Sequence, residues 1–313
     1  MAHNDIRLFD AHAHLVSDDQ ARYPRHPIEL NRPGGSGTPS PFGPGTIGIP
    51  GGMHGPHPTN EKPTAEQLHR WMCQQGVVAI AAVQKGMIYG TDNSYIVDAA
   101  DLFPDRMRAI VILDPEEDKT LPEIRAGAER GIIGVRYFPI AIEDKLAWFS
   151  SAKSVEMWAL CDELGLAVDI EGPTSDSEVL IPFIETMADR FPNAPIVLDH
   201  LFLPDVTAPD FGIGSQFDGF ASRSNVYLKW TSLSMDVTRE RGVSVEHVLR
   251  RAVDFYGADK IMWGSDIGTS SGRYDEMVRR GIESTSLLTD QERRSVLHDT
   301  GRRVLMKWGG DAA

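Results

Sequence analysis

The sequence is poor in cysteine and has no long apolar run. Its two cysteines, Cys73 and Cys161, fall in segments whose pattern predicts helices. Two separate thiols favour reduced, half-buried side chains over a disulfide or a catalytic cysteine. No apolar run approaches the ~18 residues of a membrane-spanning helix, and residues 1–5 lack the basic and apolar regions of a signal peptide. These absences predict a cytoplasmic protein that does not enter a membrane.

Basic residues are scarce relative to acidic ones. The 313 residues include 31 Lys and Arg against 45 Asp and Glu, which gives a net charge of −14. This charge argues against nucleic acids and anionic membranes as partners. It leaves room for a small-molecule substrate, because a local site can oppose the global sign, and it is compatible with a homo-oligomer. The length suits one α/β barrel domain over residues 1–313.

A pair of histidines ends the first predicted strand. The segment DAHAH, residues 10–14, follows the apolar run at residues 6–9. Side chains two apart on a strand project from the same face, so His12 and His14 are presented side by side. Such a pair suits a metal, a carbonyl oxygen or a proton transfer.

Two further apolar runs end in polar residues. The segment VLDH occupies residues 197–200, and WGSD occupies residues 263–266. We expect both to be ends of buried strands. Three such strand ends from distant parts of the chain predict a single functional site.

Between the first strand and residue 64 lies a Gly/Pro-rich stretch, residues 17–63, which we interpret as a lid-like insertion, with an interface as the alternative. Its histidines, His54 and His57, are expected to be solvent-exposed. From residue 64 onward, helices and strands alternate. Further strands are predicted at 77–84, 107–113, 132–138, 166–170, 196–201, 226–230 and 260–264, and helices at 64–75, 93–101, 121–130, 155–164, 178–190, 244–256 and 290–306.

Eight apolar strands separated mainly by helices predict an α/β fold, a (β/α)8 TIM barrel whose site lies at the carboxyl ends of the strands. An open doubly wound sheet is the rival, but the first strand is not followed by a glycine fingerprint. In a barrel these ends would gather the following polar residues: His12, His14, Gln84, Lys85, Asp114, Arg136, Asp169, Glu171, His200, Lys229 or Thr231, and Asp266.

The three motifs DAHAH, VLDH and WGSD resemble the amidohydrolase-related (amidohydrolase 2) family. Within it, the chain is most similar to the branch of 2-pyrone-4,6-dicarboxylate lactonase-like hydrolases. Supporting stretches are the residues at 83–84, 90–93, 134–136 and 204–206. The resemblance implies an amidohydrolase-type barrel and a hydrolase acting on ester bonds, which opens a lactone or related cyclic ester in aromatic or sugar-acid catabolism.

The resemblance also implies a mechanism. Asp266 activates water, while His12, His14 and His200 polarise the carbonyl. Many relatives have a histidine ligand on strand 5, where this chain has Asp169 and Glu171. Its absence favours hydrolysis without a metal or other cofactor. The alternative is a single divalent ion, Zn or Mn, held by His12, His14, Asp266, Glu171 and His200.

Six residues are candidate substrate contacts: Arg136, Lys85, Gln84, Tyr89, Phe202 and Trp230. Arg136 is the first choice for a carboxylate because guanidinium binds it bidentately. An ion pair with Asp169 or Glu171 is the competing interpretation. The chain lacks the arginine expected before Pro204 in pyrone-dicarboxylate enzymes. We therefore expect a monoanionic or neutral substrate.

Two other functions compete with a metal-free lactonase. One is a metal-dependent hydrolase or decarboxylase of the same family, which requires a tightly held ion. The other is a non-catalytic binding module. That module would have lost at least one of His12, His14, His200 and Asp266, and all four are present.

Overall fold

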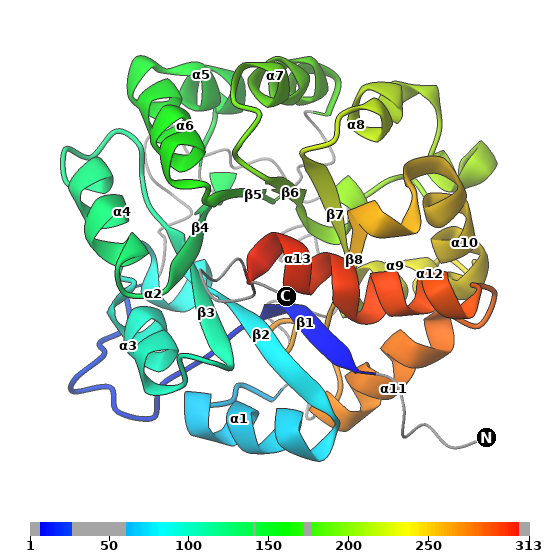
Figure 1. The fold of residues 1–313 in the computed structure, drawn as a ribbon, viewed down its shortest axis with the longest axis horizontal. Coiled ribbons are helices and arrows are strands. Elements are labelled where there is room, and N and C mark those ends of the chain that lie inside the picture. The colour runs from blue at the N-terminus through cyan, green and yellow to red at the C-terminus, as the bar shows by residue number, and fades with distance from the viewer. Residues whose placement is uncertain (1–6, 27–60, 140–141, 172–176, 307–313) are drawn as a thin grey trace, which may run out of the picture.

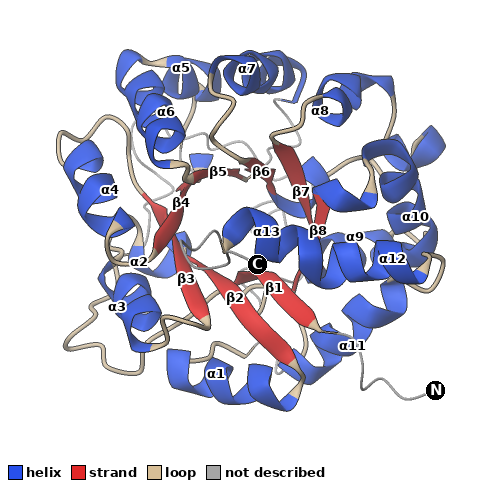
Figure 2. Cartoon of the chain, in the orientation of Figure 1, coloured by secondary structure: helices blue, strands red, loops and turns tan. Residues whose placement is uncertain are grey.

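A computed structural model describes residues 7–26, 61–139, 142–171 and 177–306. Eight parallel strands form one sheet in the order β1 to β8. They are β1 (Leu8–Ala13), β2 (Val77–Val83), β3 (Met107–Ile112), β4 (Ile132–Tyr137), β5 (Ala167–Ile170), β6 (Ile196–Leu198), β7 (Val226–Thr231) and β8 (Ile261–Gly264). Figures 1 and 2 show the strands as a ring surrounded by helices. The predicted (β/α)8 TIM barrel of the amidohydrolase type is confirmed.

The helices surround the sheet and also lie at both of its ends. They are α1 (Ala65–Gln74), α2 (Gly86–Tyr89), α3 (Ser94–Leu102), α4 (Thr120–Ala128), α5 (Lys145–Ser150), α6 (Ala152–Leu164), α7 (Ser177–Arg190), α8 (Asp218–Ser222), α9 (Ser232–Glu240), α10 (Val245–Tyr256), α11 (Tyr274–Ser284), α12 (Asp290–Arg294) and α13 (Thr300–Leu305). The sequence reading did not predict α2, α5, α9 and α11. Predicted helix 290–306 is divided by one π-helical turn, Ser295–Asp299.

The barrel closes between β1 and β8 through a few specific contacts. Ala13 and Ile267 form an isolated parallel bridge. The Asp266 amide donates to the His12 carbonyl at 2.7 Å, and the His14 amide donates to the Ile267 carbonyl at 2.9 Å. At Gly264 a Cβ would lie 2.7 Å from the His12 Cβ, so the close approach of β8 to β1 requires glycine. The closure thus fixes the histidine pair against Asp266.

Asp10 of the first motif supports this closure. Its carboxylate accepts from the Ser265 amide at 2.8 Å and from the His12 amide at 3.1 Å. The Tyr274 hydroxyl donates to the other oxygen at 3.1 Å. Burial raises the pKa of Asp10 to about 6, although these hydrogen bonds lower it. Asp10 therefore joins β1, β8 and α11 and has a structural role.

Apolar side chains form two cores. The larger lies between the strands and the surrounding helices. The smaller fills the barrel interior, where Phe9 packs with Val304, Leu305 and Met306. Because Phe9 stands near the start of β1, these contacts place α13 at the amino-terminal end of the barrel. Figure 1 shows α13 crossing the ring. The opposite, carboxyl end is left for the site.

Two local predictions differ from the structure. Strand β6 ends at Leu198, not at residue 201, because His200 to Leu203 adopt a left-handed turn with φ between 49° and 59°. Asn93 precedes α3, but its side chain does not cap that helix. It donates to the Ile112 carbonyl at 2.8 Å and accepts from the Ile112 amide at 3.0 Å, so it ties α3 to β3.

Both cysteines lie in helices and are unpaired, as predicted, but neither is half-buried. Cys73 is exposed and Cys161 is buried. Most of the expected insertion, residues 27–60 with His54 and His57, lies outside the described residues. The prediction that it forms a lid concerns these residues and therefore stays a prediction. None of the helices in the described part of the chain combines the length and apolar character needed to cross a bilayer.

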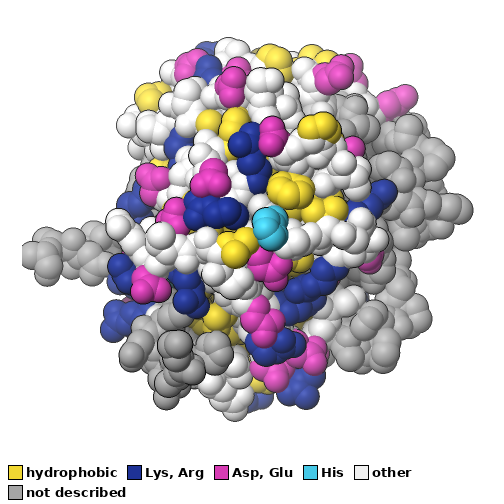
Figure 3. Space-filling view, turned by 90° about the vertical axis from the view of Figure 1, so that its right-hand side faces the viewer, with side chains coloured by type: hydrophobic (Ala, Val, Ile, Leu, Met, Phe, Trp, Pro, Cys, Tyr) yellow, Lys and Arg dark blue, Asp and Glu magenta, His cyan; other side chains and the backbone are white. Residues whose placement is uncertain are grey.

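Acidic and basic side chains are interspersed on the molecular face shown in Figure 3. Exposed ion pairs occur on the described surface. In one of them, Arg125 donates to both oxygens of Glu163 at 2.9 and 3.0 Å. Exposed pairs contribute little to stability, so Arg125 is a suitable reference for the buried charges described below.

Candidate active site

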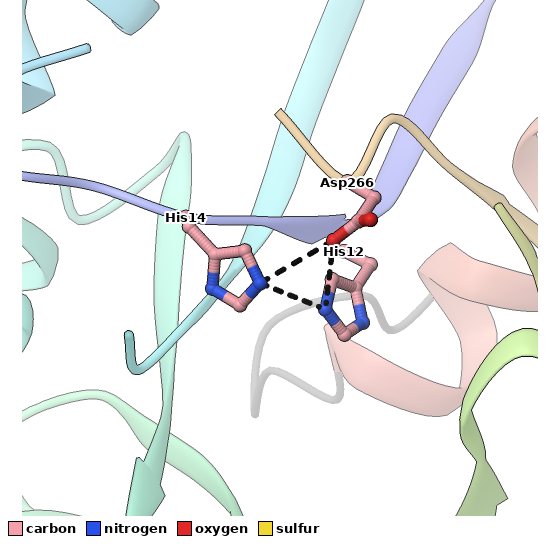
Figure 4. Close-up of side chains that lie close together, drawn as sticks. All are labelled: His12, His14 and Asp266. Atoms are coloured by element: carbon pink, nitrogen blue, oxygen red, sulfur yellow. Dashed lines mark hydrogen bonds and ion pairs between the residues drawn. The ribbon is translucent and has the colours of Figure 1, made fainter. Parts of the chain in front are cut away.

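Two histidines and an aspartate converge at the carboxyl end of the barrel (Figure 4). His12 Nε2 lies 3.3 Å from His14 Nε2, and Asp266 Oδ1 lies 3.6 and 3.3 Å from these two nitrogens. All three side chains are buried. The first and last strand ends, 254 positions apart in the chain, thus supply one compact group, as the motifs predicted.

Hydrogen bonds fix which nitrogen of His14 carries a proton. His14 Nδ1 lies 2.8 Å from the Val83 carbonyl, which can only accept, so Nδ1 is protonated. Burial lowers the pKa of His14 to about 4, and the ring is neutral at pH 7. His14 Nε2 therefore presents a lone pair to Asp266.

His12 is oriented in the same way by a carboxylate. Its Nδ1 lies 3.1 Å from Asp199 Oδ1 and 3.2 Å from Lys229 Nζ. The Lys229 ammonium bonds to Asp169 and lies 3.0 Å from Asp199. Because these carboxylates accept its protons, Lys229 does not need His12 Nδ1 as an acceptor. We assign the Nδ1 proton to the His12–Asp199 hydrogen bond. Burial lowers the pKa of His12 well below its ordinary value, and its Nε2 also presents a lone pair.

Asp266 is held in a constrained turn. Its φ of 53° lies in the left-handed region, which costs a non-glycine residue roughly 1–2 kcal/mol. Ser270 donates to Oδ2 at 2.6 Å, whereas Oδ1 has no hydrogen-bond partner in the described structure. Burial raises the pKa of Asp266, and positive charge beside the carboxylate, from a protonated histidine or a bound cation, lowers it below its usual range. Asp266 is therefore an ionised acceptor.

These donors fit a divalent metal ion. Zinc–ligand bonds of about 2.0–2.1 Å place tetrahedral ligand atoms about 3.3–3.4 Å apart, close to the separations observed here. Two imidazole lone pairs and an unpartnered carboxylate oxygen repel one another unless a cation lies between them. A second group, His12 with Asp199 and His200, also gathers potential ligands. Glu171 belongs to neither group among the described residues; its Oε2 lies 2.9 Å from Arg136 Nη2.

Arg136 is surrounded by carboxylates. Its guanidinium lies 2.7 Å from Asp199, 2.9 Å from Glu171 and 3.4 Å from Asp169. Burial lowers the pKa of Arg136, but the three acids reverse this and raise it above the ordinary value. The ion pairs considered from the sequence are thus present, and Arg136 also lines the small cavity beside Asp266. Its role as a substrate contact stays a prediction.

Asp169 shares this buried charge network. Burial and, after it, the neighbouring Asp199 raise its pKa to about 7, against the opposing effect of Lys229 and Arg136. The pKa of Asp199 is held well below its usual range, because Lys229, His12 and Arg136 together outweigh the effect of burial. Asp199 is therefore the permanent anion behind His12.

His200 borders the site from the left-handed turn after β6. Its Nδ1 lies 2.6 Å from the Thr231 hydroxyl oxygen, and that oxygen accepts from the Ser234 amide at 3.5 Å. We assign the Thr231 proton to the hydrogen bond with His200 Nδ1, which makes Nε2 the protonated nitrogen. Together with Asp266, His14 and Phe138, His200 lines a small cavity.

Three other predicted substrate contacts come from the segment that follows β2. Lys85 lines this cavity and bonds to the Thr269 hydroxyl. Gln84 follows β2 but donates to the Asp92 carbonyl. Tyr89 accepts from the Ser17 amide at 2.8 Å and borders a neighbouring cavity of about 670 Å³.

Phe202 and Trp230 point away from the cavity. Phe202 packs edge-on against Phe220, and the Trp230 indole donates to Ser284 at 3.0 Å. Both belong to the core between the sheet and the helices. Strand periodicity contained this information for β7, since Lys229 points inward and its neighbour must point outward.

Sequence reasoning did not assign roles to Asp199, Thr269 and Ser270. Asp199 stood within the VLDH motif, next to a candidate histidine. Thr269 and Ser270 had no comparable signal, because they lie in the turn after β8. Their amides donate to the Asp266 carbonyl at 3.1 and 3.0 Å.

Comparisons with known proteins identify the fold and the family of the chain. Over 229 residues the chain is 26% identical to 4-sulfomuconolactone hydrolase of Hydrogenophaga intermedia, covering 69% of this chain and 71% of that protein. A probable 2-pyrone-4,6-dicarboxylic acid hydrolase of Acinetobacter baumannii, with citric acid bound, has a similar fold. Its TM-score is 0.68 at 16% identity, over 96% of this chain and 100% of that chain.

A zinc-bound amidohydrolase of Burkholderia multivorans also has the fold, with a TM-score of 0.65 and 20% identity over 96% of this chain and 99% of that chain. The sequence matches the amidohydrolase family over residues 9–306. This match includes every strand of the barrel and all three motifs. The chain therefore belongs to the amidohydrolase family.

Proposed function

We propose that this protein hydrolyses a lactone or a related cyclic ester, with Asp266 as the general base. The observation that carries the proposal is the buried group of His12, His14 and Asp266 at the carboxyl end of the barrel. Support comes from the relatives named as a sulfomuconolactone hydrolase and a pyrone-dicarboxylic acid hydrolase.

The ligand group favours the metal-dependent form of this reaction over the metal-free form that the missing strand-5 histidine favoured. His12, His14 and Asp266 would hold one divalent ion, and zinc is bound in the related Burkholderia multivorans protein. A bound ion supplies Lewis-acid polarisation of the carbonyl and a lower pKa for water. Metal independence remains a prediction that metal analysis tests.

The chain's own residues account for the proton transfers. Asp266 accepts a proton as the water oxygen bonds to the carbonyl carbon. His200 donates a hydrogen bond from Nε2 to the oxygen that gains negative charge. The ring C–O bond then breaks, and the proton passes from Asp266 to the leaving oxygen. The product is a ring-opened carboxylate with a hydroxyl group.

Asp199 acts in this scheme as a positioning residue. It accepts from His12 Nδ1 at 3.1 Å and so directs the Nε2 lone pair of His12 toward the site. Its own place is fixed by Arg136 at 2.7 Å and Lys229 at 3.0 Å. The buried charges thus serve the orientation of His12.

The first test is Asp266→Asn, assayed on a panel of lactones. We expect kcat to fall at least about 100-fold, the lower range for loss of a general base. The unfolding midpoints of variant and wild type should be similar when both are measured with chelator. Asp189→Asn is the matched control, because Asp189 is exposed and pairs with Arg223 on the surface. Near-normal turnover of Asp266→Asn would refute the assignment.

Metal content distinguishes the two forms of the reaction. Protein purified without chelator should contain about one divalent ion per chain if His12, His14 and Asp266 are ligands. Each single alanine variant should then lose it. A content near zero in fully active protein would restore the metal-free mechanism. Release of CO2 instead of ring-opened acid from carboxylated substrates would favour the decarboxylase alternative.

A further inference from the structure

Among the described residues, three buried cations stand near the carboxyl end of the barrel, and carboxylates contact two of them. Arg136 contacts three carboxylates. Lys229 contacts Asp169 and Asp199 and is fully buried below the site. A substrate anion at either cation would face the carboxylates that already neutralise it.

The third cation, Lys85, has a different environment. It follows β2 and is only 7% exposed, and its ammonium bonds to the hydroxyl of Thr269. Within the described residues no carboxylate lies within 4.0 Å of the Lys85 ammonium, although it lines the cavity. Burial lowers the pKa of Lys85 to about 8, so most of it is charged at pH 7.

Thr269 places this charge beside the chemistry. Its amide donates to the Asp266 carbonyl at 3.1 Å within one turn, so Lys85 is joined to the loop that carries the proposed base. Phe138 and Met87 add apolar surface to the same cavity. A buried ammonium without a carboxylate partner is stabilised by an anion that enters with the ligand.

We propose that Lys85, and not Arg136, is the counter-ion for a single anionic group on the substrate. The inference rests on the proposed lactone hydrolysis and narrows its substrate class to monoanionic lactones with the charge close to the reacting ring. A second anionic group would face Asp266 and Glu171, which also line the cavity. The site therefore selects against dianions.

Paired substrates test this assignment. The wild type, Lys85→Met and Lys85→Arg are assayed on a carboxylated γ-lactone and on its neutral primary amide. We expect Lys85→Met to lose about 10- to 150-fold in kcat/KM on the acid, the range of a hydrogen bond between charged groups, mainly through KM. The amide should change less than about threefold, and Lys85→Arg should recover part of the loss. Lys153→Gln, at an exposed lysine, is the control.

A binding measurement separates this inference from the proposed function. Titration with 2-furoate, 2-furamide and 2,5-furandicarboxylate requires no turnover. Tighter binding of 2-furoate than of the other two, lost in Lys85→Met, supports the counter-ion even if no lactone is hydrolysed. Equal losses on acid and amide, or an unchanged Lys85→Met, would overturn it while lactone hydrolysis could still stand.

Discussion

Replacing Arg136 by glutamine distinguishes a structural cation from a substrate anchor. Arg136 is 3% exposed and lies within 3.4 Å of Asp169, Glu171 and Asp199. Removing one partner of a buried ion pair costs about 3–5 kcal/mol, because the other charge is left without compensation. Three acids lose one partner each, although Lys229 still contacts Asp169 and Asp199. We therefore expect Arg136→Gln to lose a comparable free energy of unfolding.

The loss should depend on pH. Without the guanidinium, the folded-state pKa values of these carboxyls rise. A group with a raised folded-state pKa contributes stability below its unfolded pKa and loses it as pH rises through the folded value. Asp169 already has a pKa of about 7, so Arg136→Gln should be relatively more stable at pH 5 than at pH 8.

Urea unfolding at both pH values measures the effect, with Arg125→Gln as the exposed control, whose midpoint should not move. A substrate anchor predicts the opposite result for Arg136→Gln. Its stability would remain within about 1 kcal/mol of wild type, the range of a weak ion pair, while KM for an anionic substrate would rise at least tenfold. That outcome would refute the structural role.

Three further predictions concern packing, acid stability and metal removal. Gly264→Ala should destabilise the barrel by about 1–3 kcal/mol through overpacking and reduce kcat, because the new Cβ would lie 2.9 Å from the His12 amide nitrogen. Gly214→Ala is the control in urea unfolding, because its new Cβ would meet only the end of Gln216. Equal unfolding midpoints of the two variants would contradict the argument. The Arg250 guanidinium lowers the pKa of Glu292 from 4.5 to about 2. The stabilisation from this ion pair is therefore present above pH 4.5 and lost as pH falls through 2. Glu292→Gln should reduce the thermal midpoint at pH 6 and converge with wild type near pH 2, and a constant difference would contradict this. A chelator should lower the thermal midpoint of the wild type and leave His14→Ala unchanged, since an ion that binds only the folded state stabilises it by mass action; identical responses would exclude His14 as a ligand.

The barrel and the convergence of His12, His14 and Asp266 could be predicted from sequence. Apolar strands alternating with helices are typical of a parallel sheet covered on both faces. The carboxyl ends of parallel strands share one end of a barrel, so three polar strand ends had to meet. The seven strands after the first start within one residue of their predicted positions.

Local backbone geometry could not be predicted in the same way. The turn from His200 to Leu203 is left-handed although it contains no glycine. Propensity alone disfavours that conformation for these residues. Contacts such as that of His200 with Thr231, at 2.6 Å, contribute to its stability, and they involve residues from a different strand.

The sequence by itself determined the fold, the order of the strands and the residues that meet at the carboxyl end. Only the tertiary structure decided how the charges pair. Arg136 contacts carboxylates from β5 and from the ends of β5 and β6, whereas Lys85 meets a hydroxyl from the turn after β8. Both residues are cations at strand ends and look equivalent in the sequence. Their partners differ because Coulomb interactions depend on the distances between side chains, and those distances are set only when the barrel closes.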